Sequence, residues 1–254
     1  MTIPNSILTT DNTKTKHGED QNIFTGIVYM APNTIGGRGN VCVDATAGCI
    51  LGCLYSAGRG KFSNVEQARI NRTQYFFDDN KAYMQQLIKE IESHIRKANK
   101  KNMVPAIRLN GTSDIPYERV KYDGKTLMEI FPELIMYDYT KSKARALKQP
   151  YDLTFSRSGG NDGDCFEMLN SNVNVAVVFD RYMGESLPKT WRGYEVIDGD
   201  VSDTRFLDKR GVVVGLHLKK TIKDVESLYP FVVKTKIVNG IVKVADELRE
   251  IRQG

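Results

Sequence analysis

Short runs of β-branched and aromatic residues recur along the second half of the chain, and each of them ends in polar residues. They begin near positions 106, 134, 153, 175, 195 and 212, and an earlier run occupies 23–30. Segments able to form helices lie between several of them, at 127–131, 144–148 and 164–170. Strands and helices that alternate in this way, at intervals of about 20 to 35 residues, predict successive βα units and a parallel sheet.

The longest helical pattern covers residues 64–100. A polar break at 78–80 divides it and supplies a cap for a second helix. In that second helix Leu87, Ile88, Ile91 and Ile95 recur at helical spacing, which predicts an apolar face that packs into the core.

These patterns predict one α/β domain over residues 1–254. Residues 1–21 are polar, so we interpret them as a loose N-terminal arm. Residues 22–220 form a (β/α) barrel-like body, either a complete or an incomplete TIM-type barrel. Residues 221–254 add a C-terminal β-hairpin, because Asn239-Gly240 lies between two β-forming runs, and then a short helix over 245–252.

Polar residues at the carboxyl ends of the predicted strands should share one rim, where barrels of this class bind their ligands. They are Asn110, Asp114, Asp138, Ser156, Arg157, Asp180, Asp198, Asp200 and Asp203. A single aspartate after a strand is more often a turn former or a helix cap, so each residue keeps that alternative. Our candidates for binding a small molecule are Arg59, Arg72, Asn110, Asp114, Asp138, Arg157 and Asp198.

Three of the four cysteines lie within twelve residues, as Cys42-x6-Cys49-x3-Cys53. Thiolates are soft ligands, and three of them in one loop suit an iron–sulfur cluster or zinc. We favour a 4Fe-4S cluster, because three local thiolates leave one iron open, whereas structural zinc takes four ligands. Oxidation would convert such a cluster to 3Fe-4S. Cys165 is either a fourth ligand or a small buried apolar residue, and we favour the second reading.

Charge and hydropathy add two expectations. The formal net charge of +5 permits a nucleic-acid partner without requiring one, and the acidic rim counts against it. No run of eighteen apolar residues is present, and the N-terminal segment lacks an apolar core, so we expect neither membrane association nor a signal peptide. The four cysteines then favour metal chemistry in a reducing compartment over disulfides.

The chain resembles a bacteriophage family named after gene product 88. The resemblance is carried by the three-cysteine segment 42–60 and by the segments 68–73, 108–114, 137–141, 153–158 and 196–200. It covers roughly residues 40–220 and implies a phage protein that acts in the cytoplasm of the infected bacterium. A more distant similarity is to radical S-adenosylmethionine enzymes, which bind a 4Fe-4S cluster through three cysteines near the start of a βα barrel. Their cysteine spacing, C-x3-C-x2-C, differs from the spacing here.

Three hypotheses about function follow. The protein is a redox or radical enzyme that binds a small molecule, such as S-adenosylmethionine, at the open iron. Alternatively, it is a non-catalytic iron–sulfur protein that senses redox state or carries electrons. The third hypothesis is a zinc-stapled nucleic-acid-binding protein.

Overall fold

A computed structural model of the protein describes residues 2–10, 18–53, 55, 60, 62–219 and 224–247. The strands are β1 (Leu8–Thr9), β2 (Ile23–Val28), β3 (Val104–Arg108), β4 (Ile135–Thr140), β5 (Asp152–Ser156), β6 (Val175–Tyr182), β7 (Thr190–Trp191), β8 (Tyr194–Asp198), β9 (Val213–Leu218), β10 (Thr235–Val238) and β11 (Ile241–Val244). The α-helices are α2 (Ala47–Leu51), α3 (Ser63–Asp78), α4 (Asn80–Lys100), α5 (Leu127–Ile130), α6 (Lys143–Lys148) and α7 (Asp162–Asn170). Short 3-10 turns are η3 (Tyr117–Arg119), η4 (Arg205–Leu207) and η5 (Glu226–Leu228).

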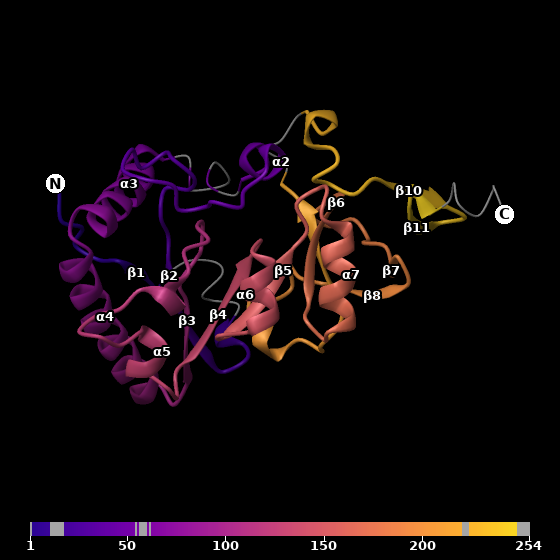
Figure 1. Ribbon diagram of the computed structural model, residues 1–254. Coiled ribbons are helices and arrows are strands. Elements are labelled where there is room, and N and C mark those ends of the chain that lie inside the picture. Colours follow the sequence, from indigo (N-terminus) through magenta and orange to yellow (C-terminus); the bar gives the residue numbers. More distant parts are fainter. Residues whose placement is uncertain are drawn as a thin grey trace.

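Nine strands form one sheet in the order β1-β2-β3-β4-β5-β6-β9-β8-β7 (Figure 1). The seven inner strands are parallel to their neighbours, whereas β1 and β7 pair antiparallel at the two edges. All six strands expected from residue 106 onward are present, and so are the helices expected between them. The sequence did not predict the two-residue edge strands or the position of β9 between β6 and β8.

A mixed α/β fold with a large, mostly parallel sheet is therefore confirmed, whereas closure into a barrel is not. The strands β2 to β6 lie side by side in chain order, which is the winding that a βα barrel requires. The order nevertheless ends at β1 and β7, and no pairing between these two strands occurs within the described residues.

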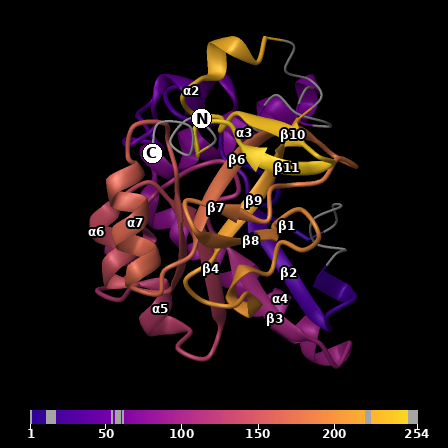
Figure 2. The same ribbon diagram turned by 90° about the vertical axis from the view of Figure 1, so that its right-hand side faces the viewer.

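The two faces of the sheet have different surroundings. On β4, Met136 and Asp138 face the layer of helices, while Ile135, Tyr137 and Tyr139 face the opposite side. Figure 2 shows α5, α6 and α7 along one side of the sheet. The opposite side is covered in part by the segment that follows β8, where the ring of Phe206 lies 5.2 Å from that of Tyr137.

Helix α4 shows why the sequence folds in this way locally. Asp79 caps its N-terminus by accepting a hydrogen bond from the amide of Ala82, as the polar break at 78–80 predicted. Leu87 and Ile91 from the predicted stripe are fully buried, and Ile107 of β3 belongs to the same apolar cluster. Burial of this face fixes the helix against the sheet.

The two terminal segments agree only in part with the sequence-based predictions. The prediction of a loose arm over 1–21 is wrong for its first part, because Ile7 is fully buried and Leu8 pairs with Val28 of β2. Glu90 of α4 holds this segment by accepting hydrogen bonds from the amides of Ile7 and Leu8. At the other end the predicted hairpin is confirmed as β10 and β11, whereas most of the helix expected at 245–252 lies outside the described residues.

Candidate functional site

A cavity of about 390 Å³ lies at the carboxyl ends of the central parallel strands. Its lining includes residues within or directly after β3, β4, β5, β6 and β9, among them Arg108, Tyr139, Ser156, Val178 and Leu216. Parallel sheets bind ligands at this end, because the strand ends and their loops converge there. Residues at the carboxyl ends of several strands therefore line one cavity and do not form only separate turns.

All three clustered cysteines line this cavity. We call residues 42–53, which carry them, the thiol wall. Helix α2 begins after Thr46, whose hydroxyl accepts from the amide of Cys49 at 3.3 Å and donates to the carbonyl of Ser158 at 2.9 Å. This residue therefore caps the helix and ties the wall to the end of β5.

The surroundings of two of the thiols, Cys42 and Cys53, raise their pKa values and so favour the protonated form. Burial, together with smaller contributions from the nearby Cys53, Asp114 and Cys49, raises the pKa of Cys42 to about 11. The thiol of Cys42 lies 3.9 Å from the carbonyl oxygen of Thr112, to which it donates. Burial also raises the pKa of Cys53, while Lys141 and Arg69 lower it. The mutual influence of the cysteines places them in one electrostatic environment.

The separation of the sulfur atoms bears on the kind of metal. In the described part of the chain, these sulfurs do not form a group in which all atoms lie within 4.8 Å of one another. Three thiolates on one tetrahedral zinc would be about 3.8 Å apart, given its bond length to sulfur. Thiolates on different irons of a cubane stand farther apart, because bridging sulfide and a second iron separate them. In the described residues the three sulfurs therefore lack the close mutual contacts that a single tetrahedral zinc would require.

Phe231, from the segment after η5, covers the thiol wall. A Cβ atom added to Gly48 would lie 2.4 Å from the Cβ of Phe231, and one added to Gly52 would lie 3.0 Å from its ring. Gly159, with a φ of +86°, passes equally close to the backbone of Phe231. Arg157 fixes this cover by donating to the carbonyls of Pro230 and Phe231 at 2.7 and 3.1 Å. The small residues therefore admit a large aromatic cover.

Three of the predicted binding residues line the cavity: Asn110, Asp114 and Arg157. Each is also held by the protein. Asn110 accepts hydrogen bonds from Ile115 and Ser113, and Arg157 pairs with Asp162. Asp114 accepts from the amide of Lys141 at 2.8 Å and is paired with Arg145. These residues shape the cavity as well as line it.

Two other predicted binding residues, Arg72 and Asp138, lie away from the cavity. Arg72 on α3 donates to the carbonyls of Ser6 and Tyr29 and does not line the cavity. Asp138 is fully buried on the helix side of β4, where it accepts from Asn110 and Tyr151, and burial raises its pKa to about 7. Arg59 lies outside the described residues. The structure thus brings neither Arg72 nor Asp138 into the cavity.

Cys165 is buried in α7 and belongs to an apolar cluster, which confirms its reading as a small core residue. Asp180, from the predicted rim, does not line the cavity but accepts from the amide and hydroxyl of Thr235 at 2.9 and 2.6 Å. It therefore holds the C-terminal hairpin against β6.

The sequence analysis missed a buried ion pair on the floor of the cavity. Arg108 donates to both carboxylate oxygens of Asp203, at 3.0 and 2.9 Å, and its guanidinium lies 4.8 Å from the centre of the Tyr139 ring. A charged residue inside an apolar strand, two positions before Asn110, was the available signal. It indicates that this face of β3 looks toward polar surroundings.

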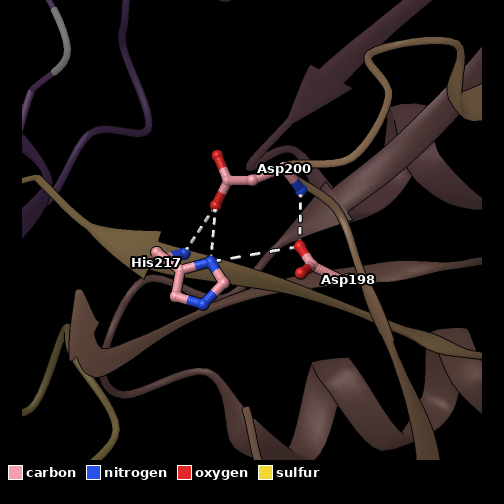
Figure 3. Close-up of side chains that lie close together, drawn as sticks. All are labelled: Asp198, Asp200 and His217. Carbon is pink, nitrogen blue, oxygen red and sulfur yellow. Dashed lines mark hydrogen bonds and ion pairs between the residues drawn. The ribbon is translucent and has the colours of Figure 1, made fainter. Parts of the chain in front are cut away.

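A second group of polar residues at the cavity comes from a part of the sequence far from the thiols. It consists of Asp198, Asp200, His217 and Lys219, and we call it the carboxylate wall. Figure 3 shows both carboxyl groups close to the imidazole ring. The Nδ1 atom of His217 lies 3.1 Å from Asp200 Oδ2 and 3.9 Å from Asp198 Oδ1. Asp200, His217 and Lys219 line the cavity, and Asp198 stands half-exposed beside them.

Hydrogen bonds favour the ionised form of Asp200. Burial alone would raise its pKa, but bonds from the His217 amide at 2.8 Å and the Lys219 ammonium at 3.1 Å lower it on balance. The cavity therefore offers soft sulfur ligands on one wall and hard oxygen and nitrogen ligands on another. The lining also includes the cationic side chains of Lys141 and Arg157, which suit a ligand with anionic groups.

Comparison with protein families shows that residues 6–228 match the family described as Gene product 88. No curated protein and no solved structure shows significant similarity to the chain. Among the described residues no helix is both long enough and apolar enough to cross a membrane.

Proposed function

The chain belongs to the gene product 88 family, and from that premise we propose that it is an iron–sulfur protein. Cys42, Cys49 and Cys53 would hold a 4Fe-4S cluster at the mouth of the cavity, and a small molecule would bind beside it. When bound, the cluster supplies electrons or an open iron to that molecule. We further propose that the parallel strands form an incomplete barrel of the kind that such clusters accompany.

The observation that carries the proposal is that the three thiols line one cavity at the carboxyl ends of parallel strands. Their side chains are half-buried, so a cluster there would be shielded from bulk solvent yet open to a ligand. The residues fit the group chemically, because the ligands are soft and small residues surround them. Metal binding would also remove the thiol protons, which the raised pKa of Cys42 otherwise retains.

The cavity favours a ligand-binding protein over a simple electron carrier. Its 390 Å³ falls within the range of small-molecule sites. Arg157 and Lys141 on its lining could neutralise an anionic group, while Tyr139 and Leu216 offer apolar contact. S-adenosylmethionine, the ligand implied by the resemblance to radical enzymes, is therefore the first small molecule to test.

The test starts with anaerobic purification followed by iron, sulfide and zinc analysis. We expect a brown protein with about four iron and four sulfide per chain and absorbance near 400 nm, typical of thiolate-bound clusters. Cys42→Ala should lose the colour and most of the iron. Cys165→Ala is the matched control and should keep both, because Cys165 lies in an apolar core. A colourless protein with stoichiometric zinc would refute the proposal.

A second measurement separates an enzyme from an electron carrier. S-adenosylmethionine is added to the reduced protein, and the EPR spectrum of the cluster is recorded. A shift of the spectrum would support binding at the open iron. An unchanged spectrum, with the iron content intact, would be compatible with the cluster but would exclude S-adenosylmethionine as its ligand.

A further inference from the structure

We propose that Asp198, Asp200 and His217 form a second metal site, which binds a divalent first-row transition metal such as Mn²⁺. The proposal does not rest on the iron–sulfur cluster. It rests on the carboxylate wall, where one oxygen from each aspartate and one imidazole nitrogen lie within 4.8 Å of one another.

The fold brings these three residues together through strand register. Strand β8 runs parallel to β9, with Asp198 opposite Gly215. The chain continues through Gly199, whose amide donates to the Gly215 carbonyl at 2.8 Å, so that Asp200 comes beside His217. A Cβ atom at position 199 would lie 2.4 Å from Val214, and only glycine allows the chain to pass so close. The site is thus built on paired strands, which hold ligands in place.

The orientation of the imidazole ring points to a cation. The Nε2 atom of His217 lies 2.9 Å from the carbonyl oxygen of Glu185. A carbonyl oxygen can only accept, so Nε2 carries a proton, and in the neutral form of the ring the lone pair of Nδ1 faces Asp200. The carboxylate oxygen facing it, 3.1 Å away, is also an acceptor. Two acceptors in contact require a positive charge between them, either a metal ion or a second proton.

The distances agree with a metal ion. Ligand bonds of about 2.1 Å place neighbouring ligands roughly 3.0 to 3.4 Å apart, for angles between a right angle and a tetrahedral one. The 3.1 Å separation of Nδ1 and Asp200 Oδ2 lies in this range. Asp198 Oδ1, at 3.9 Å from Nδ1, needs only a small movement of a half-exposed side chain.

The surrounding bonds resemble those of metal ligands. The bond from His217 to the Glu185 carbonyl is the outer contact that usually fixes a metal-binding imidazole. Asp200 uses Oδ2 toward His217 and Oδ1 toward Lys219 at 3.1 Å, so a metal need not displace the lysine. Two carboxylates and one lysine leave a single negative charge for the incoming cation. The imidazole nitrogen favours a transition metal over Mg²⁺.

Mn²⁺ binding tests the proposal, with the loss of the free-ion EPR signal as readout. Full-length protein should bind one Mn²⁺ per chain, and so should the variant with Cys42, Cys49 and Cys53 all changed to alanine. That second result separates this site from the proposed cluster. Asp198→Asn should weaken binding by at least about tenfold, because it removes a charged ligand. Glu195→Gln, an exposed acidic residue on the same strand, is the matched control and should not change it.

The imidazole provides a second readout that a loose acidic patch would not give. The chain has only three histidines, so their NMR signals can be resolved. Mn²⁺ should broaden the ring signals of His217, and a hundredfold excess of Mg²⁺ should not restore them. If the ring carries two protons at neutral pH and Mn²⁺ leaves its signals sharp, a proton fills the gap and the proposal is wrong. Displacement by equal Mg²⁺ would also refute it.

Discussion

The thiol wall of the cavity is a loop folded around the five-residue helix α2, whereas the carboxylate wall lies on two paired strands, β8 and β9. The thiol wall depends on distant residues for its shape, chiefly Phe231 above it and Asp114, whose amide donates to the carbonyl of Val41 at 2.8 Å. The carboxylate wall owes its geometry to strand register. The thiol wall should therefore lose its structure when these distant contacts are removed, whereas the carboxylate wall should keep its structure.

The largest effect should come from the support behind the thiol wall. Arg145 is buried and pairs with both Asp114 and Glu118. Arg145→Met would leave these two largely buried carboxylates without their cationic partner and should lower the free energy of unfolding by about 3 to 5 kcal/mol. Urea denaturation measures this. The exposed Arg119→Met should change stability by less than about 0.5 kcal/mol. A loss below about 1 kcal/mol at Arg145 would show that the thiol wall does not need this network.

The buried Asp138 should give the protein an unusual dependence on pH. Burial raises its pKa to about 7 in the folded state, so the folded protein retains a proton that the unfolded chain releases near pH 4. The folded state therefore binds more protons in this interval, and stability falls as pH rises. Between pH 5 and pH 7 we expect a loss of about 2 kcal/mol.

Chemical denaturation at several pH values tests this slope, and Asp138→Asn is the variant to compare. The variant should lack the decline, because asparagine does not titrate. Asp200 supplies the contrast within the same sheet, since its pKa is lowered. Its contribution to stability is present at neutral pH and is lost as pH falls below about 4. Equal slopes in the wild type and the Asp138 variant would contradict the assignment.

A smaller effect is expected from Gly48, where the thiol wall meets its cover. Gly48→Ala places a methyl group against Phe231 and should cost about 1 to 3 kcal/mol, with a lower iron content. Gly163 in α7 is the matched control, because nothing lies within 4 Å of an added Cβ there. Gly163→Ala should stabilise the protein by about 0.5 to 1 kcal/mol. Equal stability of the two variants would mean that Phe231 can move away from the added methyl group at little cost in free energy.

The smallest effect belongs to the carboxylate wall. Asp198→Asn should change the free energy of unfolding by less than about 0.5 kcal/mol, because the side chain is half-exposed and an amide oxygen can still accept from the Asp200 amide. Thermal unfolding without added metal measures this. A large loss of stability would show that the strand register does not suffice to hold this wall.

Much of the fold follows from local pattern, and the limits have physical causes. Strands and helices were predictable because their apolar residues repeat with periods of two and 3.6. The strand order β6-β9-β8 was not predictable. Strand β9 inserts between β6 and β8, and neither the composition nor the length of β9 indicates which strands are its neighbours. The same holds for β1, which owes its place to Glu90 on a distant helix.

The candidate site was predictable only in part, and Asp114 and Asp138 show why. Both are aspartates near the end of an apolar run, yet Asp114 follows β3 and lines the cavity, while Asp138 lies within β4. Inside a strand, one position decides which face a side chain takes. The sequence did not define where β4 ends, so it could not assign Asp138 to the helix side. His217 was missed as a candidate ligand for the same reason.

The position of Phe231 has a consequence for biosynthesis. Cys42, Cys49 and Cys53 are translated well before Phe231, which covers them in the folded protein. Until Phe231 is in place, Gly48 and Gly52 have no aromatic ring over them, and the thiols lack this cover. If these cysteines hold the proposed cluster, a donor of iron and sulfide would have its widest access to this loop before the segment that carries Phe231 folds over it.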